Sequence, residues 1–560
     1  MRLSRRRTAP SLFAFTCLAA PLVMARPAFA EPAPSSDAPR DLPRLVLDDG
    51  RVAPAPAEEG VIRVQIHGEY QLRYDRMQSF PLDASESVLL AHPGAVSDSL
   101  GQNSWVMHWF RVTPRVQLGK TLELVGQMDV LTGILGDTAH DTFADQTPRD
   151  QNDAFSNPQP RWLYLDWLTP VGLLRVGQMP NHWGMGLVAN DGDHPTLFGD
   201  YRYGSIGDGV LFGTKPLGKD GPLTVALGGQ YVFKDPLVDL SRGDRAVQGI
   251  LAAFLEKGGD RIGIYGAYRH QWSGHTSDSP LYTYTDAIDA VVVDVAGNAA
   301  AAVPGTDAWL FGSAEAALLV GSTDELRTPD QALTGEKTTL RSYGGAAQVG
   351  VVHLAREASG PHDTLMDWGD VVGQLELGYA SGDADPYGST QTRFTFDPNH
   401  KVGLLLFDEV MRFQTARAAS AAQDPNLSNA ARPTPGVNLI PSQGGVFGAE
   451  YINPTAIVRP RPWFDLKAGM VLAQATADVV DPYRTALHGQ QNYSGGDPGR
   501  RDLGVEFDAG FEVRVPVQET MRLALGAQGA VLAPGGALAD ASGDRMRAPW
   551  LVVGRAGIQF

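Results

Sequence analysis

Hydrophobic and polar residues alternate along several long segments of this chain. The pattern is clearest in residues 62–75, where the odd positions Arg63, Glu69 and Arg73 are polar and the even positions are apolar from Ile62 to Tyr74. Successive side chains of a strand point to opposite faces, so this segment predicts a strand with one apolar and one polar face. It is longer than the roughly five or six residues common in soluble sheets and suits a tilted membrane strand of about 9–11 residues.

The same pattern recurs near the end of the chain. In residues 502–515 the charged Glu506, Asp508, Glu512 and Arg514 share one face, and apolar residues from Leu503 to Val515 occupy the other. A face with several charges fits poorly into a sandwich core, but it suits a strand with lipid on one side and water on the other. Residues 111–118 alternate similarly, interrupted by Pro114.

Eighteen segments of this kind can be counted, and the sequence therefore predicts an all-β protein, a transmembrane antiparallel β-barrel of about 18 strands. Sixteen strands remain possible, because the segments 283–296 and 307–321 have the weakest pattern. Short turns alternate with long polar connections, which is typical of short periplasmic turns and long extracellular loops. The predicted strands are 61–76, 104–118, 122–134, 160–168, 172–179, 206–216, 222–234, 245–256, 261–271, 283–296, 307–321, 338–354, 369–382, 446–458, 463–476, 502–515, 521–533 and 547–560.

The first 30 residues have the layout of a secretory signal peptide. A basic start is followed by an apolar stretch and by Ala28-Phe29-Ala30, which predicts cleavage after Ala30. Residues 31–60 are rich in Pro, Ala and Asp and predict a periplasmic linker. The barrel is expected to occupy 61–560, with a long loop at 383–445.

Composition narrows the function further. The net charge is −17, and cleavage would remove five arginines and no acidic residue, so 46 basic residues become 41 and the net charge becomes −22. A chain this acidic is a poor candidate for binding nucleic acid. Its one cysteine, Cys17, lies in the leader, which excludes a disulfide scaffold or a thiolate metal cluster in the mature chain.

The chain ends on Phe560, with apolar residues at alternating positions back to Trp550. This segment resembles the terminal strand of bacterial outer-membrane β-barrels, and the resemblance implies that Phe560 is an assembly signal read by the barrel-assembly machinery. Residues 175–178, 182–186, 208–210 and 380–383 give a looser resemblance to porin-like and alginate-export-type barrels. It covers about a tenth of the chain and says nothing of the substrate.

Barrels of this strand number leave an aqueous channel. Both signs of charge occur at the positions expected to face it, so pairing across the wall is expected and strong ion selectivity is not indicated. Most of these residues would be solvated wall charges, although rings of charge set selectivity where a pore narrows. The pore-lining candidates are Arg63, Glu69, Arg73, Arg111, Arg115, Glu123, Asp129, Arg175, Arg269, Glu376, Asp465, Lys467, Glu506, Asp508, Glu512, Arg514 and Arg522.

The long loop contains a candidate constriction. Its apolar residues recur at helical spacing and predict a short amphipathic helix, which would either enter the lumen, or cap the outer rim or pack on a neighbouring loop. The constriction candidates are Val402, Leu405, Leu406, Val410 and Phe413.

Other motifs predict neither cofactor nor metal. His182, Asp191, Asp193 and His194 could converge on a cation, but an exposed glycine-rich loop gives them no fixed geometry. Asp383, Asp385 and Asp397 lack the spacing of a calcium loop. Tryptophan and tyrosine near strand ends, among them Trp109, Trp162 and Tyr164, are expected in interfacial girdles.

Three functions therefore compete. The first is an outer-membrane channel for diffusion of small hydrophilic solutes, and the second is a closed barrel acting as surface adhesin or structural protein. The third, an outer-membrane barrel enzyme, is disfavoured because no catalytic constellation stands out. The expected partners are outer-membrane lipid, the barrel-assembly machinery and a small hydrophilic solute, with no nucleic acid; the sequence leaves the oligomeric state open.

Overall fold

The computed structural model divides the chain into residues 1–38 and residues 39–560. The residues that the structure describes all belong to the second unit. They are 62–79, 104–133, 158–194, 196–200, 204–240, 244–257, 260–272, 287–324, 331, 334–353, 370–385, 388–423, 440–461, 463–482, 484–485, 489–518 and 521–560.

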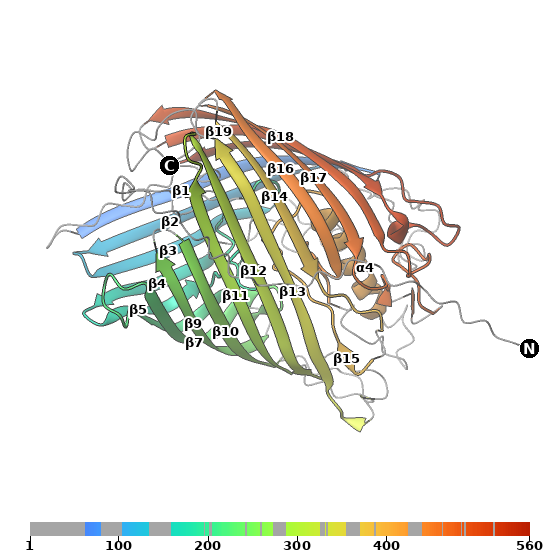
Figure 1. Ribbon diagram of the computed structural model, residues 1–560, viewed down its shortest axis with the longest axis horizontal. Coiled ribbons are helices and arrows are strands. Elements are labelled where there is room, and N and C mark those ends of the chain that lie inside the picture. The colour runs from blue at the N-terminus through green and yellow to red at the C-terminus, as the bar shows by residue number, and fades with distance from the viewer. Residues whose placement is uncertain are drawn as a thin grey trace, which may run out of the picture. The chain divides into compact units, whose positions relative to one another are not determined.

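Eighteen long antiparallel strands form one closed barrel (Figure 1). Each long strand pairs with the next along the chain, and the last strand closes the barrel on the first, with Glu69 opposite Gln559 and Gln78 opposite Trp550. The predicted fold class and the count of eighteen are thus confirmed. The segment expected at 283–296 is a strand, displaced toward the C-terminus to Ile288–Ala302.

The strands are β1 (Ile62–Gln78), β2 (Ser104–Leu118), β3 (Leu122–Gly133), β4 (Gln159–Thr169), β5 (Gly172–Pro180), β6 (Ile206–Thr214), β7 (Leu223–Asp235), β8 (Val238–Asp239), β9 (Arg245–Lys257), β10 (Asp260–Trp272), β11 (Ile288–Ala302), β12 (Ala308–Thr323), β13 (Thr338–His353), β14 (Val371–Ala380), β15 (Thr390–Gln391), β16 (Ala449–Arg461), β17 (Phe464–Ala475), β18 (Asp502–Gln518), β19 (Met521–Pro534) and β20 (Trp550–Gln559). The helical elements are the π-helix η3 (Leu406–Met411), α4 (Arg412–Gln423) and the 3-10 turn η5 (Gly536–Leu538). Two of the strands, β8 and β15, are two-residue additions to the barrel wall.

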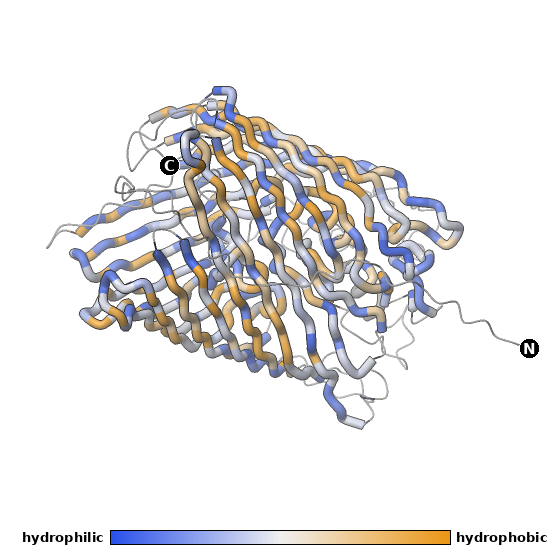
Figure 2. Tube along the Cα trace, viewed as in Figure 1, coloured by the Kyte–Doolittle hydropathy of each residue, from blue (hydrophilic) through white to orange (hydrophobic). Residues whose placement is uncertain are grey.

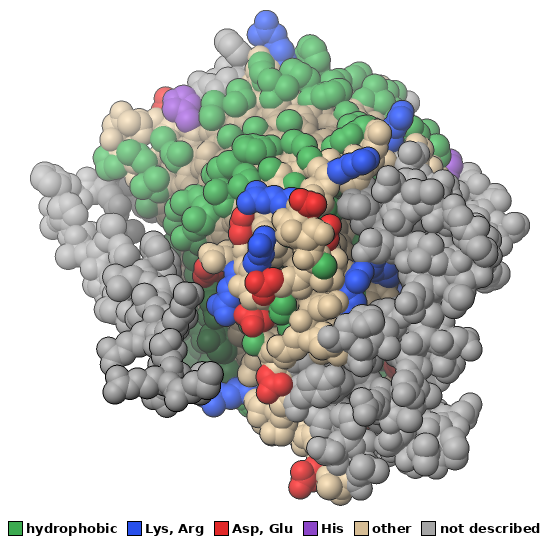
Figure 3. Space-filling model, turned by 90° about the vertical axis from the view of Figure 1, so that its right-hand side faces the viewer, with side chains coloured by type: hydrophobic (Ala, Val, Ile, Leu, Met, Phe, Trp, Pro, Cys, Tyr) green, Lys and Arg blue, Asp and Glu red, His purple; other side chains and the backbone are tan. Residues whose placement is uncertain are grey.

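The outer face of the wall is apolar. On β1, Val64 and Ile66 are 60% and 57% exposed, whereas Arg73 and Asp75 on the opposite face are buried. Hydrophobic and hydrophilic positions alternate along the strands in Figure 2, and hydrophobic side chains cover the visible wall in Figure 3. A closed sheet satisfies its backbone hydrogen bonds internally, and an apolar outer face suits hydrocarbon. The barrel is therefore built to cross a membrane.

The connections differ between the two ends of the barrel. At one end most are short, such as 119–121 after β2 and 170–171 after β4, while those at the other end are long. Residues 354–370, between β13 and β14, depart from this rule at the short-turn end. Among the described residues, no helix is both long and apolar enough to cross a membrane.

Two of the long connections pack against the inner wall. They are the described residues of the β5–β6 loop (181–194, 196–200 and 204–205) and of the β14–β16 loop (381–385, 388–423 and 440–448), which contains η3 and α4 (Figure 1). Residues of both loops share one buried hydrophobic cluster with wall residues such as Met107, Val471 and Leu532. The predicted amphipathic helix is only partly right, because the chain forms η3 followed by α4, and Leu404 to Phe407 are all buried.

Candidate functional site: the interior of the barrel

The β14–β16 loop is anchored by one carboxylate of the wall. The Glu506 side chain on β18 accepts hydrogen bonds from the backbone N–H groups of Leu404, Leu405 and Leu406, at 2.7, 2.7 and 2.6 Å. These N–H groups lie at the start of η3, where a helix has no backbone acceptors of its own. An acidic group at this position is also favoured by the helix dipole. Glu506 thus holds the inner loop against the wall.

The β5–β6 loop is anchored in the same way on the opposite set of strands. Glu315 on β12 accepts the backbone N–H groups of Met185 and Leu187, the latter at 3.0 Å. On the neighbouring strand β11, the Asp294 carboxylate accepts the indole N–H of Trp183 at 3.1 Å. These residues fix the first half of the loop.

Two arginines hold the second half of the β5–β6 loop. Arg111 donates to Asp129 on the adjacent strand at 2.7 and 3.1 Å, and to Asp193 of the loop at 3.0 Å. Arg161 on β4 donates to the carbonyl oxygen of Asp191 at 2.8 Å. Buried charges require partners of this kind. Arg111 and Asp129 were expected to line the lumen. They pair with each other, and Arg111 also contacts the loop.

The loop ends at a cluster of charges on the far side of the barrel. Asp200 forms ion pairs with Arg73 on β1 and with Arg555 on β20, the latter at 2.6 Å. Arg555 also donates to the carbonyl oxygen of Gly199 at 3.0 Å. The β5–β6 loop therefore spans the interior from β11 and β12 to β1 and β20.

A cavity of about 130 Å³ lies beside this cluster, between the loop and strands β1, β2 and β16 to β20. Four acidic and three basic side chains border it. The basic Arg514 pairs with Asp465 and Glu512, both at 2.7 Å, and Lys467 lies 3.4 Å from Glu512. The charged side chains are Glu69, Asp200, Asp465, Lys467, Glu512, Arg514 and Arg555.

His400 joins the two inner loops to the wall. Its Nε2 lies 3.0 Å from Glu376 on β14, and its Nδ1 lies 3.2 Å from the carbonyl oxygen of Met185. Tyr451 on β16 donates to the same Glu376 oxygen at 2.6 Å. A carbonyl and a carboxylate both accept, so the two contacts suit a protonated imidazole that donates from each nitrogen. Burial lowers the pKa of His400, but the charge and hydrogen bond of Glu376 outweigh it and raise that pKa.

The pore-lining candidates are all buried or half-buried, whereas several of their apolar neighbours on the strands, such as Leu72, Leu124 and Phe507, are exposed. The structure gathers Glu69, Glu512 and Arg514 around the cavity. Arg115 and Glu123 pair at 3.7 Å on the wall, and Arg175 pairs with Asp166 at 2.7 Å. The pattern predicts that Glu506 faces the lumen, but its carboxylate accepts backbone N–H groups of the loop. Arg269 pairs with Asp235 at 2.5 Å, and Arg63 and Arg522 are half-buried on their strands.

The constriction candidates are all buried at 3% exposure or less, within the hydrophobic cluster. The girdle assignment of Trp162 and Tyr164 was wrong, because both are buried on the inner side of β4 while Leu163 and Trp167 are exposed. Trp109 likewise borders the cavity and donates to Asp129 at 3.0 Å. Successive side chains of a strand alternate between its two faces, and these aromatic residues fall on the polar face, which points into the barrel.

Sequence reasoning missed several residues that organise the interior. Asp200 and His400 lie in long connections, where alternation carries no information about contacts. Asp193 was considered as a cation ligand, and the structure instead pairs it with Arg111. Asp294 and Glu315 carry a usable signal, because each is an acidic residue flanked on both sides by apolar residues within a strand. The two segments with the weakest pattern therefore hold the anchor of the β5–β6 loop.

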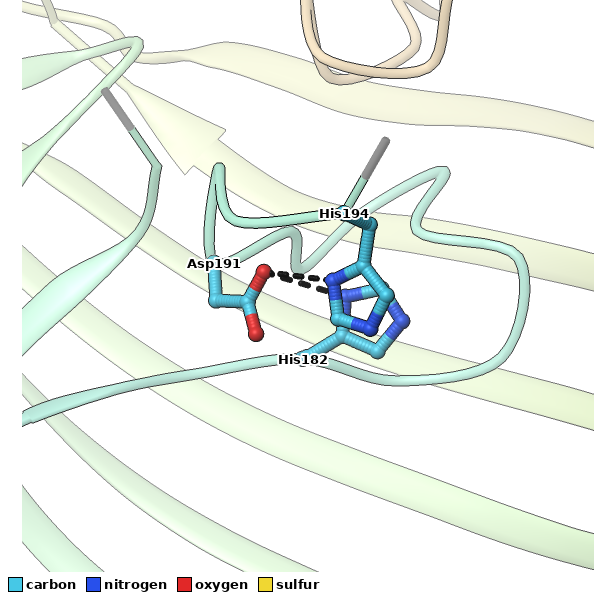
Figure 4. A group of neighbouring side chains, drawn as sticks. All are labelled: His182, Asp191 and His194. Carbon is cyan, nitrogen blue, oxygen red and sulfur yellow. Dashed lines mark hydrogen bonds and ion pairs between the residues drawn. The ribbon is translucent and has the colours of Figure 1, made fainter. Parts of the chain in front are cut away.

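The β5–β6 loop also brings His182, Asp191 and His194 together (Figure 4). The Nδ1 atom of His194 lies 2.7 Å from Asp191 Oδ1, and that of His182 lies 3.9 Å from the same oxygen. Burial raises the pKa of the Asp191 carboxyl, but the hydrogen bond and charge of His194 outweigh it and hold that pKa well below its usual range. The prediction that this loop has no fixed geometry was wrong, because the wall holds it at both ends.

The closed barrel with its apolar outer face defines the chain as a transmembrane antiparallel β-barrel. No protein-family model matches the chain, and no curated protein matches it. Among solved structures, it is similar to Pseudomonas aeruginosa OccK11 (OpdR), at 11% identity and a TM-score of 0.42 over 90% of this chain and 97% of that chain. It is also similar to P. aeruginosa OccK2 (OpdF) in complex with glucuronate, at 10% identity and a TM-score of 0.42 over 88% and 97%. For OmpTdeltaL8, a loop L8 deletion mutant of OmpT, an outer membrane protein of Vibrio cholerae, the identity is 9% and the TM-score 0.34 over 89% and 99%.

Proposed function

We propose that this protein is an outer-membrane channel through which small hydrophilic solutes diffuse. The observation that carries the proposal is the charged cavity inside a closed barrel of eighteen strands. Barrels of this strand number enclose more space than their own wall side chains fill. The β5–β6 and β14–β16 loops narrow that space, and the charges around the cavity would contact a hydrated solute on its way through.

Four acidic side chains against three basic ones border the cavity. The excess of one negative charge supports a mild preference for cations. Because most of these groups are paired with one another, strong selectivity is not expected.

A closed barrel that acts as a surface adhesin or structural protein is the second candidate. The packing of Phe396, Leu405 and Phe413 into one hydrophobic cluster inside the barrel favours it. This cluster resembles a domain core more than the wall of a wide aqueous pore. The two candidates differ in one measurable property, which is ion conductance.

The test is single-channel conductance of the purified protein in a planar bilayer, under a salt gradient. Discrete steps with a slightly cation-selective reversal potential are expected. A variant in which residues 400–423 are replaced by a short glycine-serine linker should give larger steps, provided that it keeps its heat-modifiable migration in gels. Insertion without conductance in both proteins would overturn the channel and favour the closed barrel.

Export and assembly belong to the same proposal. Cleavage after Ala30, a periplasmic linker at 31–60 and a barrel at 61–560 would place the protein in the bacterial outer membrane, where it contacts lipid. Recognition of Phe560 by the barrel-assembly machinery would insert it. The N-terminal sequence of the protein isolated from outer membranes tests the cleavage site. No enzymatic activity is part of this proposal.

A further inference from the structure

Two imidazoles and one carboxylate converge on a single point of the β5–β6 loop. The rings of His182 and His194 are stacked, with centroids 3.9 Å apart and an angle of 17° between their planes. Both Nδ1 atoms are directed at Asp191 Oδ1 (Figure 4), and one ligand atom of each residue lies within 4.8 Å of the other two. Imidazole nitrogen with carboxylate oxygen is a donor set that Zn²⁺, Cu²⁺ and Ni²⁺ bind.

The backbone that carries these side chains is cross-linked by its own hydrogen bonds. The N–H of Trp183, next to His182, donates to Ala189 at 3.0 Å, and the N–H of Ser205 donates to Asn190 at 2.6 Å. The Asn190 side chain accepts the N–H of Gly192 at 3.0 Å. Gly186 has a φ of +80°, and a Cβ there would lie 2.4 Å from Asn190 Nδ2. The two halves of the group are therefore held together before any ligand arrives.

Contacts with the wall decide which acidic group is available. Asp193 is taken up by Arg111 at 3.0 Å and by Gln127 at 3.2 Å. Arg161 contacts Asp191 through its backbone carbonyl oxygen. The Asp191 Oδ1 atom faces both histidines and also accepts the N–H of Asp193 at 3.0 Å, which fixes its position. The side chains of His182, Asp191 and His194 are 27%, 13% and 25% exposed, so a dissolved cation can reach them.

We propose that His182, Asp191 and His194 form a binding site for one divalent transition-metal cation inside the barrel. Metal–ligand bonds of about 2.0–2.2 Å in a tetrahedron place ligand atoms roughly 3.4 Å apart. The observed separations of 2.7 and 3.9 Å lie on either side of that value. Metal binding would require both Nδ1 atoms to be unprotonated, with the ring proton on Nε2. A small rotation of the two rings would then direct both Nδ1 lone pairs at the cation. Three protein ligands leave a fourth position open to water or to a solute oxygen.

Such a cation would join residue 182 to residues 191–194 and stiffen the loop that crosses the interior. The proposal does not depend on conductance, because the three ligands and the contacts that hold them belong to the folded barrel whether or not it conducts. Failure of the channel hypothesis would therefore leave it intact, and the reverse also holds.

The test uses the full barrel in detergent, carrying no polyhistidine tag, after treatment with EDTA and desalting. Titration calorimetry with Zn²⁺ should show one equivalent bound, with Mg²⁺ giving no signal. The variants His182→Ala, His194→Ala and Asp191→Asn should each weaken Zn²⁺ binding at least tenfold. His270→Ala is the matched control, because His270 also pairs with an aspartate, Asp289 at 2.7 Å, but lies on strand β10.

Two results would overturn the site. One is a wild-type protein that binds no Zn²⁺, and the other is undiminished binding in a folded double variant lacking both His182 and His194. Heat-modifiable migration in gels shows which variants are folded. If the variants do not fold, X-ray absorption at the zinc edge of the loaded wild-type protein decides. A shell with two imidazoles supports the site, and a shell without histidine overturns it.

Discussion

Glu506 lies on strand β18 and Leu405 lies 101 residues earlier in the chain, yet the Glu506 carboxylate accepts the backbone N–H of Leu405 at 2.7 Å. The same carboxylate accepts the neighbouring N–H groups of Leu404 and Leu406. One wall residue thus satisfies three backbone donors at the start of η3. This contact joins the start of η3 to the inner wall.

Replacing this carboxylate should loosen the loop while the barrel stays folded. In Glu506→Gln, one oxygen becomes an NH₂ group that faces backbone donors, so at least one hydrogen bond is lost at a cost of about 1–3 kcal/mol. Hydrogen–deuterium exchange should accelerate in residues 402–412. Glu512→Gln on the same strand is the control, because Glu512 pairs with Lys467 and Arg514 and not with the loop. Equal exchange in both variants would contradict the anchor role.

The second anchor should act on the other loop alone. Glu315→Gln disturbs the N–H groups of Met185 and Leu187, so exchange should accelerate in residues 183–189 and remain near wild type in residues 404–406. Each of the two variants thus serves as the other's control. Acceleration of both loops by either single variant would show that they move as one unit.

The His400 contact predicts a dependence on pH. Because Glu376 raises the pKa of His400 above its ordinary value, the protonated ring stabilises the folded loops below about pH 6.5. That contribution is lost as the pH rises through the raised pKa. Exchange in residues 397–402, corrected for its intrinsic pH dependence, should therefore increase with pH in the wild type. His400→Gln, in which residue 400 cannot titrate, should show a smaller increase, and the double variant His400→Gln, Asp397→Asn should show none from these two groups.

Asp397 should give a different pH window. Burial raises the pKa of this carboxyl to about 7, although the Asn399 N–H groups oppose that shift. The folded chain therefore binds more protons than the unfolded chain between about pH 4 and 7, and its stability falls as the pH rises through that range. Asp397→Asn should match the wild type near pH 4 and protect residues 395–400 better at pH 8. Equal protection of the wild type and Asp397→Asn at pH 8 would mean that burying the ionised Asp397 carboxylate does not destabilise the fold at that pH.

Phe560, which follows the last strand, also pairs with the first strand and so helps to close the barrel. Phe560 exchanges two backbone hydrogen bonds with Gly68 at 2.8 and 2.9 Å, and a Cβ at Gly68 would lie 2.5 Å from its ring. Phe560→Ala should therefore reduce the amount of heat-modifiable barrel recovered from outer membranes. Val552→Ala on the same strand removes only lipid-facing atoms and is the control. Similar recovery of both variants would show that Phe560 is not needed for assembly of the barrel.

The sequence alone was enough to predict the wall of this protein. A strand alternates its side chains every second residue, so lipid and interior leave a local signature that can be counted along the chain. The strand count, the two faces and most turns follow from that signature, and residues such as Val64 and Arg73 lie on the sides expected.

Only the tertiary structure decided where the long connections lie. Met185 meets Glu315 across 130 residues of sequence, Asp200 meets Arg73 across 127, and His194 meets His182 only because the loop between them folds back. Such contacts depend on the closure of the barrel and on buried charges finding partners. Neither closure nor charge pairing repeats at a regular spacing along the sequence. The wall could therefore be predicted from the sequence, and the packing of the interior could not.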